Sequence, residues 1–200
     1  MSFIVPTDFK GDKYISQNVF TLEDLQYYID TVQEKILKEL LGEDLYLKLL
    51  ADCTNNVPAT QKYIDLLNGK TYTETNAEGT TVNVQYKGLK EMLRYFTFYY
   101  FMKEQPFRAT ISGVMAGENE NGKAISAMQL NRIVVQAYNK GVDLYGKKLS
   151  VYETETVSAK IYSVKYNAEI IRGNAYNFLY KYKTTYPTWS FIEKSYIFLI

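Results

Sequence analysis

The spacing of apolar residues predicts a long first helix at residues 21–42. Leucine, isoleucine and valine recur there at intervals of three and four residues, which places them on one face of a helix. Thr21 can cap the first turn, where Glu23 and Asp24 favour the positive end of the helix dipole, and Gly42 is a typical helix terminator. The predicted buried stripe consists of Leu22, Leu25, Ile29, Val32, Ile36 and Leu40.

Shorter elements follow this helix. The segment "EDLYLKLLADC" predicts a second helix with acidic residues in its first turn, and a third helix begins near Ala59 and ends at Gly69. Residues 70–87 predict a β-hairpin, because apolar and polar residues alternate at 82–86 and "NAEG" supplies a turn. A lone hairpin is marginally stable in water, so we expect this one to pack against the helices or a partner.

Six aromatic rings occupy seven consecutive positions in "YFTFYYF", residues 95–101. They belong to a predicted helix between Gly88 and Pro106 that is apolar nearly all round, and such a helix has no face for solvent. We expect it at the centre of a bundle, with a subunit interface as the alternative. A glycine- and asparagine-rich loop at about 107–122 precedes another long helix at about 123–146. The predicted apolar stripe of that helix is Ile125, Met128, Val135, Tyr138, Val142 and Tyr145.

The last fifty residues have a less regular pattern. We predict a helix at about 159–182 with a weak point at Gly173, and leave 147–158 unassigned because strand and helix periodicities overlap there. Pro187 is expected to end this helix. An apolar terminus must be buried, so the tail either folds back over its own bundle or docks on another chain. Its apolar residues are Trp189, Phe191, Tyr196, Ile197, Phe198, Leu199 and Ile200.

Together these elements predict a mainly α protein. The expected architecture is a helical bundle with a small β-hairpin insertion and an extended apolar C-terminal tail. We divide the chain into a helical domain at 1–184 and a C-terminal docking tail at 185–200, since no internal repeat or linker separates other parts.

Composition favours a contact surface over a charged binding surface. Tyrosine occurs 20 times in 200 residues and suits contact surfaces, although compositional drift explains part of this excess. The net charge of +1 gives no electrostatic case for binding nucleic acid or a membrane surface. The first residues do not form a signal peptide and no window is apolar enough to span a membrane, so we expect a soluble protein. A single cysteine, Cys53, indicates a reducing compartment and a structural role.

Residues suited to catalysis are sparse. The chain has no histidine, which excludes serine–histidine and cysteine–histidine pairs and the usual zinc or iron sites, and it has no glycine motif for nucleotides. The start of a helix explains Glu43 and Asp44, and a solvated loop explains Glu118 and Glu120. Interleaved lysines and tyrosines after residue 147 can bind single-stranded nucleic acid, but a helix with one aromatic and one lysine face gives the same pattern. We expect no enzyme, cofactor or metal site.

Several segments resemble a known family in their order and composition. They are "LLGEDLYLKLLAD", "GLKEMLRYFTFYYFMKEQ", "TISGVMAGENENGKAIS" and "QLNRIVVQAYNKGVDLY". With the capped first helix, the short helix and the hairpin, they resemble head-to-tail connector (adaptor, head-completion) proteins of tailed bacteriophages. The resemblance is closest to the versions from phages of gut Bacteroidetes, including crAss-like phages. It covers about residues 20–150 and includes no catalytic motif.

The resemblance implies a mostly helical subunit that repeats as a homo-oligomeric ring beneath the portal protein, in the neck of the virion. Such rings extend the DNA channel without sequence-specific DNA binding, and they offer a platform for tail proteins. Portal docking through a terminal segment would fall on residues 189–200. Contacts between neighbouring subunits, or with the next ring, would fall on the hairpin at 70–87 and on the loop around 111–122. The loop residues singled out are Ile111, Ser112, Gly113, Val114 and Met115.

Two alternatives remain open at this point. The first is another virion assembly or tail-completion factor. The second is a small host-directed binding protein that inhibits a host enzyme, which would act as a monomer.

Overall fold

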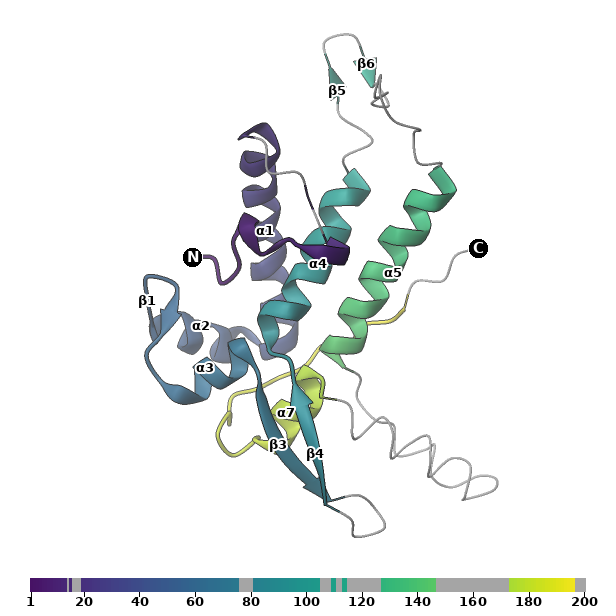
Figure 1. The fold of residues 1–200 in the computed structure, drawn as a ribbon. Coiled ribbons are helices and arrows are strands. Elements are labelled where there is room, and N and C mark those ends of the chain that lie inside the picture. The colour runs from purple at the N-terminus through teal and green to yellow at the C-terminus, as the bar shows by residue number, and fades with distance from the viewer. Residues whose placement is uncertain are drawn as a thin grey trace, which may run out of the picture.

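The computed structural model describes residues 1–13, 15, 19–75, 81–104, 109–110, 113–114, 127–146 and 173–196. Its architecture is mainly helical with small antiparallel two-stranded sheets, which confirms the predicted fold class (Figure 1). The α-helices are α1 (Val19–Leu41), α2 (Glu43–Ala51), α3 (Gln61–Asn68), α4 (Leu89–Glu104), α5 (Ala127–Tyr145) and α7 (Ala175–Lys181). The paired strands are β1 (Cys53–Thr54) with β2 (Val57–Pro58), β3 (Lys70–Thr75) with β4 (Thr81–Tyr86), and β5 (Ala109–Thr110) with β6 (Gly113–Val114).

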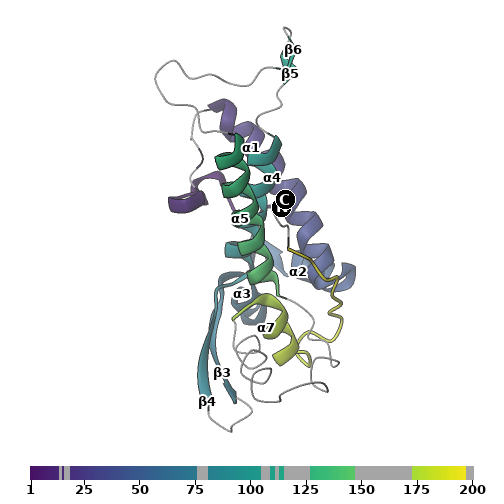
Figure 2. The same ribbon diagram turned by 90° about the vertical axis from the view of Figure 1, so that its right-hand side faces the viewer.

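The aromatic helix α4 lies between α1 and α5 and contacts both of them (Figures 1 and 2). Its apolar residues therefore meet neighbours on both sides, as expected for a helix without a solvent face. Phe96, Phe98 and Phe101 are all buried, and so is Thr97 between them. The prediction that this helix is central to the bundle is confirmed.

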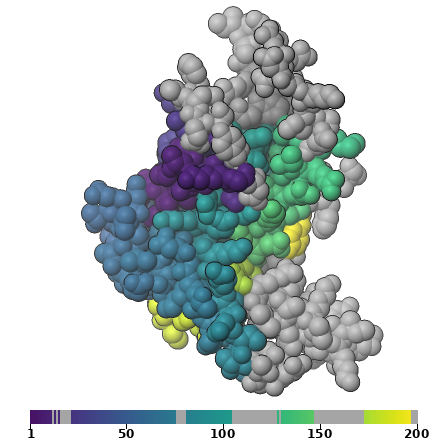
Figure 3. All heavy atoms as spheres, viewed as in Figure 1, coloured from purple at the N-terminus to yellow at the C-terminus, as the bar shows by residue number. Residues whose placement is uncertain are grey.

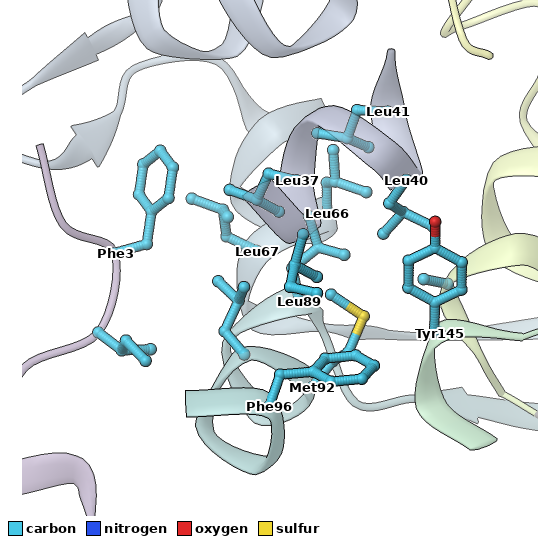
Figure 4. Close-up of a cluster of buried hydrophobic side chains, with 14 of the residues drawn as sticks. Phe3, Leu37, Leu40, Leu41, Leu66, Leu67, Leu89, Met92, Phe96 and Tyr145 are labelled. Carbon is cyan, nitrogen blue, oxygen red and sulfur yellow. The ribbon is translucent and has the colours of Figure 1, made fainter. Parts of the chain in front are cut away.

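The core is continuous from α1 through α3 to α4 and α5. Figure 4 shows leucines of α1 and α3 packed over Leu89, Met92 and Phe96 of α4, with Tyr145 of α5 at the side. Most of the predicted α1 stripe is buried, and Leu22, at its beginning, is half-buried. The fully buried members of that stripe are Leu25, Ile29, Ile36 and Leu40.

The N-terminal segment lies across the helices and is fixed by polar contacts (Figure 3). The side chain of Gln33 in α1 is buried, accepts a hydrogen bond from Phe3 N (2.6 Å) and donates one to Met1 O (2.7 Å). Lys13 is also buried, and its ammonium lies 3.2 Å from a carboxylate oxygen of Glu91 in α4. These pairings satisfy polar groups whose unpaired burial would be costly.

The hairpin packs on the C-terminal part of the chain. Tyr72 faces Val84 across the two strands, and Tyr86 stacks on Phe178 of α7 with ring centroids 4.3 Å apart. The Tyr86 hydroxyl also donates a hydrogen bond to Leu66 O at 2.9 Å. The expectation that this hairpin needs support from helices is confirmed, since it contacts both α7 and α3.

Two predictions about α1 and α5 are wrong. α1 begins at Val19, so Thr21 lies inside the helix instead of capping it. Met128 is 82% exposed, because the buried face of α5 follows Val134, Ala137 and Tyr145, and Met128 falls off that face. Its inclusion in the stripe came from continuing the apolar pattern one turn too far.

The predicted helix at 159–182 is also wrong at Gly173. α7 begins only at Ala175, where the side chain of Asn174 caps it by accepting a hydrogen bond from Asn177 N at 2.8 Å. Gly173 instead lies against β4, since a Cβ added there would come within 1.9 Å of Gln85 O. α7 ends at Lys181, before Pro187, so Pro187 does not end it. Residues 147–172, which include the unassigned segment, lie outside the described residues.

Candidate functional site

The first candidate site is the C-terminal anchor, residues 189–196, which includes three of the predicted docking residues. Trp189, Phe191 and Tyr196 are half-buried and pack against the core of their own chain. The first of the two alternatives for the tail, folding back over its own bundle, therefore holds as far as Tyr196. Ile197, Phe198, Leu199 and Ile200 lie outside the described residues.

The C-terminal anchor completes the end of α1. The last carbonyls of a helix have no partner within it, and α2 begins directly after Gly42, so little chain is left to cap them. Gly42 N donates to Lys38 O at 3.0 Å. The next three carbonyls accept hydrogen bonds from the anchor: Ile192 N to Glu39 O (2.9 Å), Trp189 Nε1 to Leu40 O (2.8 Å) and Ser190 N to Leu41 O (3.2 Å).

Aromatic side chains hold the same segment from the other side. The ring of Phe191 lies 5.2 Å from Tyr145 of α5 and 4.7 Å from Tyr176 of α7, and Trp189 lies 5.4 Å from Tyr176. The Tyr145 hydroxyl donates to Ile192 O at 2.6 Å, and the Tyr196 hydroxyl donates to Asp143 at 2.6 Å. The anchor thus joins α1, α5 and α7, which are far apart in the sequence.

The tyrosines of this region pack in the core, and their hydroxyl groups have raised pKa values. Burial raises the pKa of Tyr145, and the negative charge of Glu39 adds to this effect. Burial likewise raises the pKa of Tyr186, whose hydroxyl donates to Lys62 O at 2.7 Å. Both side chains therefore stay neutral and donate hydrogen bonds at ordinary pH.

The predicted inter-subunit loop lies where α4 ends and α5 begins. Gly113 and Val114 form β6 and pair with Thr110 and Ala109 of β5, and Figure 1 shows this small hairpin beyond the end of the helices. Ile111, Ser112 and Met115 lie outside the described residues. The structure thus separates this loop from the C-terminal anchor and from the larger hairpin, so the predicted contact regions do not form one site.

Exposed apolar residues on the outer helices were missed by the sequence reasoning. Tyr27 of α1 is 66% exposed, and Met128 of α5, which was assigned to the buried stripe, is exposed as well. Ile133 of α5 is a further example, and Ile192 of the C-terminal anchor is exposed as well. The available signal was position: Tyr27 lies off the buried stripe of its helix and is still large and apolar.

Two open hollows flank the hairpin. The larger, about 580 Å³, is lined by Gln85 of β4, Lys87 just after it, Asn139 and Asp143 of α5, and Tyr196 of the C-terminal anchor, among others. The other, about 500 Å³, lies between the base of the hairpin and the start of α4, and its lining also includes Gln85 and Lys87. Their mixed charges and amides select no particular ligand.

The predicted acidic pairs have ordinary surroundings where they can be seen. Glu43 begins α2 and lies 3.3 Å from the Lys38 ammonium, while Glu118 and Glu120 lie outside the described residues. Within the part of the chain that the structure describes, no group of three or more histidine, cysteine or acidic side chains is placed to hold a metal ion. None of the described helices combines the length and apolar character that crossing a membrane requires.

Comparison with known proteins gives a family without an assigned role. Neither the curated proteins nor the solved structures give a match to the chain. Residues 37–152 match DUF6712, described as a family of unknown function, and this region runs from the end of α1 past the end of α5. Since the match spans more than half of the chain, the protein belongs to the DUF6712 family.

Proposed function

We propose that this protein is a structural subunit of a head-to-tail connector ring in a tailed-phage virion. The ring lies in the neck between capsid and tail, docks on the portal protein, extends the DNA channel and provides the platform for tail attachment. It is assembled in the host cytoplasm and acts through its surfaces, without catalysis, cofactor or metal.

The observation that carries the proposal is the order of elements from α1 to α5. The resemblance to connector proteins rests on a first amphipathic helix, a second helix, a short helix with a hairpin, an aromatic helix, a glycine-rich segment and a last long helix. The described elements α1, α2, α3, β3–β4, α4 and α5 follow that order. The aromatic residues of the central helix α4 fill the core and make it rigid. A rigid core suits a ring subunit, because every copy must present the same contact surface to the next.

The packing of the C-terminal anchor on its own bundle leaves only the outer side of the anchor for docking on the portal. Trp189, Phe191 and Tyr196 already contact their own bundle, and Trp189 cannot leave it without uncapping α1. Ile192 lies among them and is 61% exposed, with Glu193 exposed beside it. We therefore assign the portal contact to the outer side of the C-terminal anchor, centred on Ile192.

The experiment that tests the proposal is the copy number of the chain in purified particles from its source. Quantitative mass spectrometry with the portal and major capsid proteins as internal standards should give a fixed low number, equal to the portal's or a simple multiple of it. Absence from mature particles would overturn the connector role, and the assembly-factor and inhibitor alternatives would then lead.

Portal docking has its own test. The purified chain should bind portal assemblies from the same source, and Ile192→Glu should abolish that binding while leaving the far-ultraviolet circular dichroism unchanged. Lys183→Glu, on an exposed residue outside the C-terminal anchor, is the control. Equal binding by all three proteins would overturn the assignment of Ile192.

A further inference from the structure

The outer face of α1 carries an acidic residue and an aromatic residue that are both exposed. Glu23 and Tyr27 are four residues apart, so they lie on the same side of the helix. Tyr27 is 66% exposed and touches Tyr28 edge-on, with ring centroids 5.6 Å apart. Within the described parts of the chain, the carboxylate of Glu23 has no hydrogen bond or ion pair. We call these two residues the α1 patch.

The outer face of α5 carries the complementary pair at the same spacing. Met128 and Arg132 are also four residues apart, and both are exposed, Met128 at 82%. The guanidinium of Arg132 forms no hydrogen bond or ion pair with any other described residue. We call these two residues the α5 patch.

The two patches lie on opposite flanks of the molecule at the same height. α4 separates α1 from α5, as Figures 1 and 2 both show. The Tyr28 hydroxyl, next to the α1 patch, bonds to Glu104 at the end of α4, and the α5 patch lies in the first turns of α5, at that same end. Patches at equal height on opposite flanks are what a closed ring requires, because an offset along the axis would produce a helical filament.

The charges around the two patches have opposite balances. Exposed charged residues along α1 are Glu23, Asp30 and Glu34 against one lysine, Lys35. Along α5 they are Arg132 and Lys140 against one aspartate, Asp143. Opposite charges favour the contact of α1 with α5, whereas a contact between two α1 faces would bring like charges together.

We infer that the α1 patch of one subunit packs against the α5 patch of the next subunit in the ring. α1 and α5 are both antiparallel to α4, so they run in the same direction, and Arg132 of one subunit lies level with Tyr27 of the next. The guanidinium of Arg132 stacks on the ring of Tyr27 and attracts the carboxylate of Glu23 one turn away, while Met128 packs beside them. The contact is heterologous, so each copy uses one patch on each flank. This inference rests on the proposed ring assembly and names the occupant of both faces as a second copy of the chain.

Charge reversal tests the pairing. Sedimentation velocity over a concentration series should show concentration-dependent self-association of the natural chain. Glu23→Arg and Arg132→Glu should each weaken it by about tenfold or more, because like charges then face each other, and the double variant should recover most of the loss. All of these side chains are exposed, so circular dichroism should remain unchanged.

Lys10→Glu is the matched control for Arg132→Glu, since it changes the net charge equally on an exposed residue of the N-terminal segment. It should associate as the natural chain does. A chain that stays monomeric at every concentration, single variants that associate normally, or a double variant without recovery would each overturn the inference.

Cross-linking tests the geometry. In a Cys53→Ser background, chains carrying Tyr27→Cys and chains carrying Met128→Cys are mixed and treated with a short bismaleimide. A head-to-tail contact gives dimers only when both chains are present, whereas Tyr27→Cys chains that cross-link among themselves would show a symmetric contact and overturn the inference.

The two proposals fail in different ways. If the copy number matches that of the portal but the charge reversals do not change self-association, the connector role stands and the proposed contact between the α1 and α5 patches is wrong. If the chain is absent from particles but its self-association responds to the charge reversals as expected, the contact between the two patches stands and the connector role is wrong.

Discussion

Two aromatic-rich regions of this protein, α4 and the chain from Asn174 to Tyr196, use their rings in different ways. In α4 the most deeply buried rings are phenylalanines, Phe96, Phe98 and Phe101, which fill space and carry no polar atom. The C-terminal region relies on tyrosine and tryptophan, whose polar groups reach backbone carbonyls, as Trp189 does at Leu40 O. Burial in α4 supplies bulk stability, whereas ring and hydrogen bond together fix where the C-terminal chain lies.

The largest effect on stability is expected in α4, where the rings fill space. Phe96 is fully buried, with its ring centroid 5.5 Å from that of Tyr138 and 6.2 Å from that of Tyr145. Phe96→Ala removes a whole ring from a packed core and should lower the free energy of unfolding by about 3–5 kcal/mol. Urea unfolding followed by circular dichroism measures this loss.

Tyr180→Ala provides the control for this measurement. Tyr180 is 56% exposed, so its replacement should change the free energy of unfolding by less than about 0.5 kcal/mol. A similar loss for both variants would mean that α4 is not the centre of the core.

An intermediate effect on stability is expected for variants of the C-terminal anchor. Trp189→Ala removes a half-buried ring and the donor to Leu40 O, and should lower the free energy of unfolding by about 2–3 kcal/mol. Trp189→Phe keeps a ring and removes only the donor, so it should cost about 1 kcal/mol. Thermal and urea unfolding of the two variants separate the two contributions. An unchanged melting temperature for Trp189→Ala would revive the idea of a tail that serves only for docking.

The sequence predicted the helical part of the fold well, because its signals are local. The stripe of α1, the terminating Gly42 and the aromatic run of α4 each depend on residues within a few turns of one another. Gly173 could not be understood from its neighbours in the sequence. The local pattern predicted that it lies in a helix, but the structure requires glycine there because the backbone of Gln85, 88 positions away in the chain, approaches too closely for a side chain. Its effect can be known only once the hairpin and α7 are packed together.

The candidate site was less predictable for the same reason. An apolar tail has to be covered, but its pattern does not tell whether the cover is its own bundle or another chain. The deciding contacts are the carbonyls at the end of α1, which lack partners only because α2 begins directly after Gly42. Tyr27 was missed because an exposed apolar residue has no periodicity of its own, whereas the predicted stripe of α5 was extended one turn too far and so included the exposed Met128.

A smaller effect isolates a single hydrogen bond of the C-terminal region. Tyr186 is buried, and its hydroxyl donates to Lys62 O at 2.7 Å. Tyr186→Phe keeps the ring and leaves that carbonyl without this donor, so it should lower the free energy of unfolding by about 1–2 kcal/mol. Urea unfolding provides the value, with Tyr180→Phe as the exposed control. A loss no greater than the control's would show that rings alone hold this region.

The smallest expected effect lies at the rim of α4, where a tyrosine of α1 combines both uses of aromatic rings. Tyr28 packs edge-on against Phe101 at 5.6 Å and hydrogen-bonds to Glu104. Burial raises the pKa of Tyr28 to about 12, and the bond to Glu104 and its charge add to the increase. The folded state therefore favours the neutral phenol, so this stabilisation is complete below the unfolded pKa of about 10 and is lost as the pH rises toward 12.

Tyr28→Phe removes that dependence. The difference in free energy of unfolding between the natural chain and Tyr28→Phe should shrink across this alkaline window, by less than about 1 kcal/mol because solvent screens the site. Urea unfolding at a series of alkaline pH values measures the difference, and other tyrosines that ionise there cancel in it. A difference that stays constant through the window would place the hydroxyl of Tyr28 in free solvent, and α4 would then be held at this end by ring packing alone.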